Sequence, residues 1–187
     1  MSGEIIKNNF QLYCMNILKL FKQITTFIFD VDGVLTDGTV LLLENGVQAR
    51  RMNIKDGFAL QLAVKKDYRV LIVSGGNSPQ VTGRLEKLGI TDVHMSVEDK
   101  KAMITKYIAE NKLKKEEVLF MGDDLPDLPV MSIVGLPCCP ADAVAEIKDS
   151  VQYISPINGG FACVRDVIEK VLKLNDKWEY SVDVTSR

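Results

Sequence analysis

The sequence predicts an α/β fold in which a mainly parallel sheet is doubly wound by helices. From Thr25 onward, short apolar segments alternate with amphipathic segments. Such alternation is typical of right-handed βαβ units that build a parallel sheet. Acidic or glycine-rich stretches directly follow several of the apolar segments. Because the carboxyl ends of parallel strands meet at one edge of a sheet, we expect a functional site at that edge.

Length and composition indicate one domain with a substantial core. The chain has 187 residues, of which 47% are hydrophobic, and its formal net charge is -2. This charge gives no electrostatic reason to expect a nucleic-acid partner. The apolar stretches are only as long as strands, so we expect no membrane span. We assign residues 1–23 to an N-terminal helix and residues 24–187 to a single domain.

The N-terminal segment and the cysteines indicate a cytoplasmic protein. Residues 1–23 carry apolar side chains at roughly helical spacing, without the pattern of a signal peptide. We therefore predict an amphipathic helix that packs on the domain or on a partner. The four cysteines form no Cys-x-x-Cys pair, which favours buried, reduced thiols.

In the first half of the chain, runs of β-branched and aromatic residues predict strands, and Pro79 suits the first turn of a helix. The expected strands are Thr25 to Phe29 and Arg69 to Val73, and the expected helices are Asp56 to Lys66 and Pro79 to Leu88.

A hairpin is predicted directly after the first strand. Thr39 to Leu43 and Val47 to Met52 flank Asn45-Gly46, a pair suited to a type I′ turn. In this position a hairpin would project over the carboxyl end of the sheet as a flap or an interface. An ordinary hairpin packed on its own sheet fits the spacing equally well.

The second half continues the alternation of strands and helices to the end of the domain. The expected strands are Asp92 to Met95, Val118 to Met121 and Val151 to Ile154, and the expected helices are Lys101 to Asn111, Asp127 to Ile133 and Phe161 to Leu174. Gly135 to Cys138 is expected to be a short buried segment.

The first strand ends in two carboxylates, Asp30 and Asp32, followed at once by Gly33. Residues i and i+2 of a strand point to the same side, so the two carboxylates would converge and repel each other unless a cation lies between them. A divalent metal ion is the natural ligand for such a pair. The alternative is a solvated turn, because Asp and Gly are common turn residues.

Three further groups of polar residues follow or precede predicted elements. Ser74-Gly75-Gly76-Asn77 follows a strand and can turn hydroxyl and backbone N–H groups toward an anion, although such loops are often plain turns. Lys100 lies where a helix begins. Asp123, Asp124 and Asp127 form a second acidic cluster after Val118 to Met121.

Between Thr25 and Leu174, the chain resembles the haloacid dehalogenase superfamily. The four motifs of that superfamily are matched, in order, by Asp-x-Asp-Gly-Val, Ser-Gly, Lys and Gly-Asp-Asp-x-x-Asp. The segments 29–38, 53–57 and Gly159-Gly160-x-x-x-x-Arg165 are similar to a subgroup without a cap domain that acts on keto-acid sugar phosphates. In that subgroup the hairpin replaces the cap, and homotetramers form in which a neighbouring subunit completes each active site. The resemblance thus implies a capless fold with shared sites.

The resemblance also implies the chemistry of each motif. Asp30 would attack phosphorus as a nucleophile, and Asp32 would protonate the leaving group and then activate water. Mg²⁺ would be held by Asp30, the backbone carbonyl of Asp32 and Asp123. The phosphate would be bound by Ser74, Gly75 and Lys100. The remaining carboxylates, Asp124 and Asp127, would orient the metal ligands.

The same resemblance implies substrate contacts and a pathway. The residues expected to contact the sugar are Thr36, Asp56, Asn77 and Arg165. The expected reaction is hydrolysis of 3-deoxy-D-manno-octulosonate 8-phosphate (KDO 8-phosphate) in lipopolysaccharide precursor synthesis. Relatives often carry arginine at or near the position of Asn77, so the 9-phosphate of a nine-carbon keto acid stays open as the alternative.

Two functions of other classes use similar residues. Receiver modules combine aspartates, a Ser/Thr and a lysine on a doubly wound sheet, but their phosphate acceptor stands alone on a later strand, whereas here Asp30 and Asp32 end the first strand. A catalytically silent interaction protein could keep the fold. The presence of all the expected reactive residues favours the enzyme. His94, the lone histidine, is interpreted as structural.

Overall fold

The computed structural model describes residues 16–179 and has a six-stranded sheet at its centre. Its order is β5-β4-β1-β6-β7-β8, and all neighbouring strands pair in parallel. This confirms the doubly wound parallel fold. The strands are β1 (Thr26–Phe29), β4 (Arg69–Val73), β5 (Asp92–His94), β6 (Val118–Met121), β7 (Leu136–Cys139) and β8 (Tyr153–Ile154).

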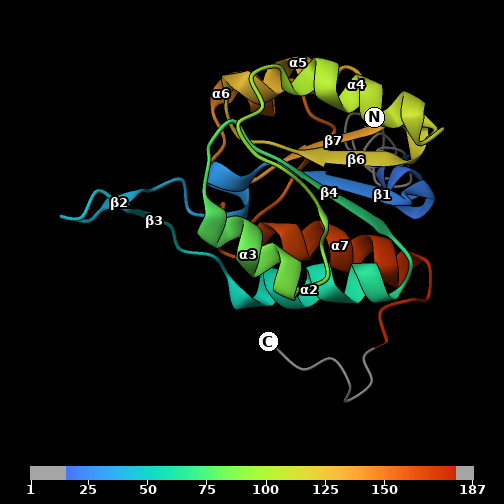
Figure 1. Cartoon of the computed structure of the whole chain (residues 1–187). Helices are drawn as coiled ribbons and strands as arrows, with labels where there is room; N and C mark the ends of the chain where they lie inside the picture. The colour runs from blue at the N-terminus through green and yellow to red at the C-terminus, as the bar shows by residue number, and fades with distance from the viewer. Residues whose placement is uncertain (1–15, 180–187) are drawn as a thin grey trace, which may run out of the picture.

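Helices cover both faces of the sheet (Figure 1). On one face lie α2 (Ile54–Lys65), α3 (Pro79–Lys87) and α7 (Cys163–Leu174), and on the other lie α4 (Lys100–Glu110), α5 (Leu128–Met131) and α6 (Ala145–Lys148). One apolar cluster fills the space on each side. β1 and β6 are buried along their whole length, which is why both read as continuous apolar runs.

Short helical turns connect several elements and refine the predicted boundaries. They are η1 (Val31–Leu35), η2 (Lys115–Glu117) and η3 (Leu125–Asp127). The helix predicted from Asp127 to Ile133 is shorter and is preceded by η3, because Pro126 and Pro129 each start a separate turn. The sequence analysis missed α6, since four residues are too few to show helical periodicity.

The predicted hairpin is present, but its turn differs from the prediction. β2 (Leu41–Leu42) and β3 (Gln48–Ala49) pair antiparallel and stand away from the body of the domain (Figure 1). Gly46 N donates to Leu43 O at 2.9 Å, and in this turn Gly46 alone has a positive φ. A type I′ turn needs positive φ at both central residues, so this is a three-residue turn closed by a left-handed glycine.

The N-terminal helix and the cysteines are described in part. Residues 16–23 are helical, and Phe21 is buried with its ring edge-on to Tyr153 at 5.0 Å. This part of the helix packs on the domain, whereas residues 1–15 lie outside the described range. Cys138, Cys139 and Cys163 are buried and free, and Cys14 lies outside that range. Within residues 16–179, no helix combines the length and apolarity needed to cross a membrane.

Candidate active site

Asp30 begins the site at the carboxyl end of β1. Its backbone N–H donates to Met121 O at 3.0 Å, which ties it to the end of β6. The chain then turns through η1, where Gly33 has φ 83°. A Cβ on Gly33 would lie 2.0 Å from the Asp123 carboxylate, so only glycine permits this close approach of the two loops. The Asp30 side chain is buried.

Lys100 reaches the same point from the first residue of α4. Asp99 caps this helix by accepting a hydrogen bond from Ala102 N at 2.9 Å. The Lys100 Nζ atom lies 2.9 Å from Asp30 Oδ1 and 2.7 Å from Asp127 Oδ1. A cation at the amino end of a helix opposes the helix dipole. The two carboxylates offset this unfavourable position.

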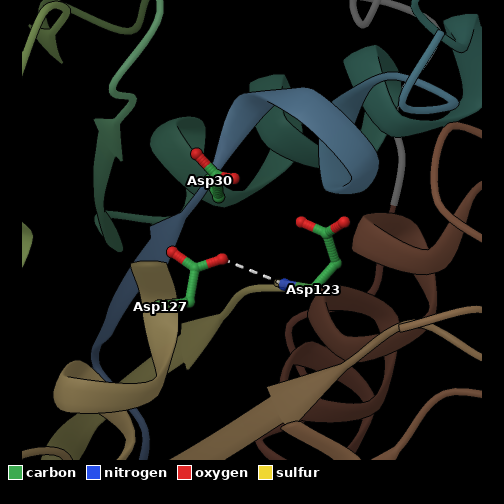
Figure 2. Close-up of side chains that lie close together, drawn as sticks. All are labelled: Asp30, Asp123 and Asp127. Carbon is green, nitrogen blue, oxygen red and sulfur yellow. Dashed lines mark hydrogen bonds between the residues drawn. The ribbon is translucent and has the colours of Figure 1, made fainter. Parts of the chain in front are cut away.

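The second acidic cluster follows β6. Asp127 Oδ2 accepts a hydrogen bond from Asp123 N at 3.0 Å, as Figure 2 shows. Asp124 is exposed and caps η3 by accepting from Leu125 N at 2.8 Å. Both oxygens of Asp127 are thus engaged, one by Lys100 and one by the loop backbone. Asp127 therefore links Lys100 to the loop that carries Asp123.

Burial and mutual repulsion make the carboxylates hard to ionise in the absence of a cation. Burial, together with the charge of Asp127, raises the pKa of Asp30 to about 7 despite the nearby Lys100. Burial and the charge of Asp30 likewise raise the pKa of Asp123 to about 7. Burial alone would lower the pKa of Lys100, but the charges of Asp30 and Asp127 raise it above its ordinary value. Lys100 therefore stays protonated.

The carboxylates fit a divalent cation. Asp30, Asp123 and Asp127 each offer an oxygen, and these oxygens lie within 4.8 Å of one another (Figure 2). The Asp123 Oδ1 atom is buried and has no hydrogen-bond partner among the described residues. An unpartnered buried carboxylate oxygen is costly unless something binds it. Hard oxygen ligands in this number suit Mg²⁺.

A cavity of about 470 Å³ lies over these side chains. Ser74 and Gly75 lie in its wall together with the cluster, and Ser74 Oγ accepts from Gly76 N at 3.1 Å. The structure thus brings together most of the predicted site residues. The lining residues are Asp30, Asp32, Gly38, Ser74, Gly75, Gly76, Val97, Glu98, Lys100, Asp123, Asp124, Pro126 and Asp127.

The four predicted sugar-contacting residues do not line this cavity. Thr36 is fully buried, and its Oγ1 donates to Val31 O at 3.2 Å and so braces the loop after Asp30. Asp56 is 1% exposed and accepts from Arg165 N at 2.6 Å at the start of α7. Asn77 is exposed outside the cavity. Thr36 and Asp56 thus make contacts that support the structure of their own subunit.

Arg165 lies in a different cavity, of about 510 Å³, on the surface of α7. Its Nε donates to Glu169 Oε2 at 3.0 Å, and its guanidinium lies 5.8 Å from the ring centre of Phe58 and 5.3 Å from that of Trp178. The described chain therefore does not bring Arg165 to Asp30.

The sequence analysis missed Arg50, which forms an ion pair with Asp32 at 2.6 Å. The signal was the pair Arg50-Arg51 at the end of the hairpin, since alternation along an extended chain sends one of them inward. It also missed Glu98, which lines the cavity next to the helix cap Asp99.

Comparisons with known proteins agree with this geometry. Residues 92–168 match the family described as haloacid dehalogenase-like hydrolase. The chain is 32% identical over 164 residues to 3-deoxy-D-manno-octulosonate 8-phosphate phosphatase of Yersinia pestis, covering 88% of each chain. It is also 32% identical to the enzyme of that name from Escherichia coli K12, covering 87% of this chain and 86% of that protein.

Solved structures give the same result. The crystal structure of the Yersinia pestis phosphatase superposes with a TM-score of 0.83 over 86% of both chains. The phosphatase of Moraxella catarrhalis, solved with magnesium, phosphate and KDO, is 28% identical and gives a TM-score of 0.82, covering 85% of this chain and 91% of that one. With this fold and this acidic cavity, the chain belongs to the haloacid dehalogenase-like hydrolases and is a phosphomonoesterase.

Proposed function

We propose that the protein hydrolyses KDO 8-phosphate to KDO and phosphate, as a step in lipopolysaccharide precursor synthesis. The observation that carries the proposal is the buried Asp30, held by Lys100 at 2.9 Å beside Asp32 and Asp123 in one cavity. The relatives that are 32% identical over most of both chains are named as the phosphatase for that substrate.

Catalysis proceeds in two displacements at phosphorus. An oxygen of Asp30 attacks, the bond between phosphorus and the sugar oxygen breaks, and Asp32 gives its proton to that oxygen as it leaves. Asp32 then takes a proton from water, which attacks the aspartyl-phosphate and releases phosphate and free Asp30. Lys100, Ser74 and the Gly75 backbone hold the phosphoryl oxygens, and the lysine charge offsets the charge that develops on them.

We propose Mg²⁺ as the cofactor, held by the carboxylates of Asp30 and Asp123 and the carbonyl of Asp32. When bound, it would neutralise the repulsion between the nucleophile and the phosphate and align the two. The unpartnered Asp123 Oδ1 and the magnesium in the Moraxella catarrhalis structure support this choice.

We further propose a cytoplasmic homotetramer with shared active sites. The hairpin carries exposed leucines in its strand β2, Leu41 and Leu42, and a tetramer would bury them. Arg165, remote from Asp30 in its own subunit, would contact the substrate carboxylate in a neighbour's site. The free, buried Cys138, Cys139 and Cys163 support a reducing compartment.

A phosphate-release screen tests the substrate. We expect the highest kcat/KM for KDO 8-phosphate, lower values for 9-phosphates of nine-carbon keto acids, and little release from hexose phosphates. A clear preference for a 9-phosphate would replace the proposed substrate. Asp30→Asn is the control, because an amide cannot act as the nucleophile, and near-normal release by this variant would end the covalent mechanism.

A further inference from the structure

Arg50 joins the hairpin to Asp32, a residue that lines the cavity. It follows β3, and its Nε lies 2.6 Å from Asp32 Oδ1 while its Nη2 lies 3.3 Å from Asp32 Oδ2. The Arg50 side chain is 8% exposed, whereas that of Asp32 is 38% exposed. Both oxygens of Asp32 thus face the guanidinium, while part of the Asp32 side chain stays exposed in the cavity wall.

We propose that Arg50 is the positioning residue for Asp32 and that it makes the hairpin of the same subunit part of the catalytic geometry. The inference rests on the proposed role of Asp32 as the group that exchanges protons with the leaving oxygen and with water. Arg50 acts through Asp32, since it does not itself line the cavity around Asp30.

The form of the contact supports a positioning role. A guanidinium that makes two parallel hydrogen bonds fixes the plane of a carboxylate, which a single bond cannot do. Proton transfer depends on that orientation, and a misplacement of about 1 Å can lower the rate about 100-fold. Asp32 lies within η1 but has an extended backbone, with φ -76° and ψ 121°.

Gly76, which lines the same cavity, lies close to this ion pair. A Cβ on Gly76 would lie 3.1 Å from Asp32 Oδ2 and 3.6 Å from Arg50 Nη2. A Cβ at this position would crowd the Asp32 carboxylate and come into ordinary van der Waals contact with Arg50. The absence of a side chain at Gly76 therefore leaves the space that the Arg50–Asp32 pair occupies.

Arg51 provides a matched comparison within the same segment. It points the other way, pairs with Asp37 at 2.6 Å and lies 5.4 Å from the ring centre of Phe161. Its side chain is 71% exposed. Both arginines tie the hairpin to the loop after β1, but only Arg50 contacts a group of the reaction.

The experiment measures kcat and KM for Arg50→Met, Arg50→Lys and Arg51→Met, using the sugar phosphate that the wild type hydrolyses best. For Arg50→Met we expect kcat to fall about 10-fold to 100-fold with KM changed less than about threefold, because the lost contact orients a proton donor rather than binding the substrate. Arg50→Lys should recover part of kcat, since it restores the charge without the two-bond geometry. Arg51→Met should keep kcat within about twofold of the wild type.

Three other results would overturn the inference. A loss confined to KM would make Arg50 a substrate-binding residue. Equal loss of kcat in Arg50→Met and Arg51→Met would reduce Arg50 to general support of the hairpin. Thermal unfolding of all variants shows whether a loss of kcat is due to misfolding. If Arg50→Met is misfolded, the kcat of Arg50→Lys decides whether Arg50 positions Asp32. Full activity of Arg50→Met beside an inactive Asp32→Asn would reject the inference and leave the proposed function intact, whereas an active Asp32→Asn would reject the proposed function.

Discussion

At the scale of single residues, the site is organised by carboxylates that burial keeps from ionising easily. Asp30 and Asp123 each have a pKa of about 7, mainly because they are buried. Lys100 and two backbone N–H groups engage both oxygens of Asp127. A bound cation would supply to Asp30 and Asp123 the partner that the protein supplies to Asp127.

We predict that Mg²⁺ stabilises the chelator-treated protein and that Asp123→Asn loses most of this effect. A ligand present at about 100 times its dissociation constant adds about 2.7 kcal/mol to the free energy of unfolding. Protons compete with the cation for Asp30 and Asp123, so the rise in melting temperature should be larger at pH 8 than at pH 6. Thermal unfolding with and without Mg²⁺ measures this.

Asp124→Asn is the control for the metal experiment. Asp124 is exposed and caps η3, so this variant should keep the wild-type response to Mg²⁺. An unchanged response in Asp123→Asn would show that the cation binds elsewhere.

At the scale of elements, α7 depends on a residue of another helix for its first turn. The residue before α7 is Ala162, which has φ 87° and no side chain that can cap the helix. Asp56 of α2 accepts the hydrogen bond from Arg165 N instead, and its Oδ2 has no hydrogen-bond partner within the described part of the chain. Asp56 thus links the two helices at the cost of a buried carboxylate.

This capping contact predicts a pH-dependent stability. Burial raises the pKa of Asp56 to about 6 from its ordinary 3.8, so the folded state favours the protonated form. The contribution of Asp56 to the free energy of unfolding is fully present below about pH 4 and is lost as the pH rises through about 6. Relative to the wild type, Asp56→Asn should therefore gain about 1–3 kcal/mol in unfolding free energy between pH 4 and pH 7.

Denaturant unfolding across this pH range measures the effect. Asp56→Ala, which removes the capping oxygen, should lose about 1–2 kcal/mol relative to Asp56→Asn at every pH. A constant difference between the wild type and Asp56→Asn from pH 4 to pH 7 would mean that the buried carboxylate stays ionised throughout.

At the scale of the whole molecule, the hairpin exposes apolar side chains that a single subunit does not bury. Leu41 is 64% exposed and Leu42 is 73% exposed, on a pair of strands that lies apart from the main sheet (Figure 1). A two-stranded hairpin has little stability of its own in water. Contact with other subunits would remove these leucines from water and hold the strands in place.

We predict a tetramer in light scattering that the double substitution Leu41→Asn and Leu42→Asn dissociates, with activity falling as the tetramer is lost. The physical reason is the loss of apolar area from the assumed interface. Leu18→Asn is the control, since Leu18 is exposed on helical residues 16–23, remote in sequence from the hairpin. A fully active wild-type monomer would rule out the shared site.

Much of this organisation was predictable from the sequence because it depends on neighbours along the chain. The strands β1, β4 and β6 read as apolar runs, and the acidic or serine-containing residues that follow them are brought together by parallel pairing alone. The motif order from Asp30 to Asp127 therefore identified the aspartates, Ser74 and Lys100 of the cavity wall, but not Glu98. The hairpin was visible in the same way, from two β-favouring runs around Asn45-Gly46.

Only the tertiary structure decided the contacts between segments remote in the sequence. Arg50 meets Asp32 because the segment after β3 returns to the loop after β1, and Asp56 meets Arg165 because α2 and α7 pack side by side on one face of the sheet. No local pattern encodes such pairs, since the energy that selects them comes from packing of whole elements. The sequence thus determined which chemistry the carboxylates can perform, and packing determined which residues hold them in place.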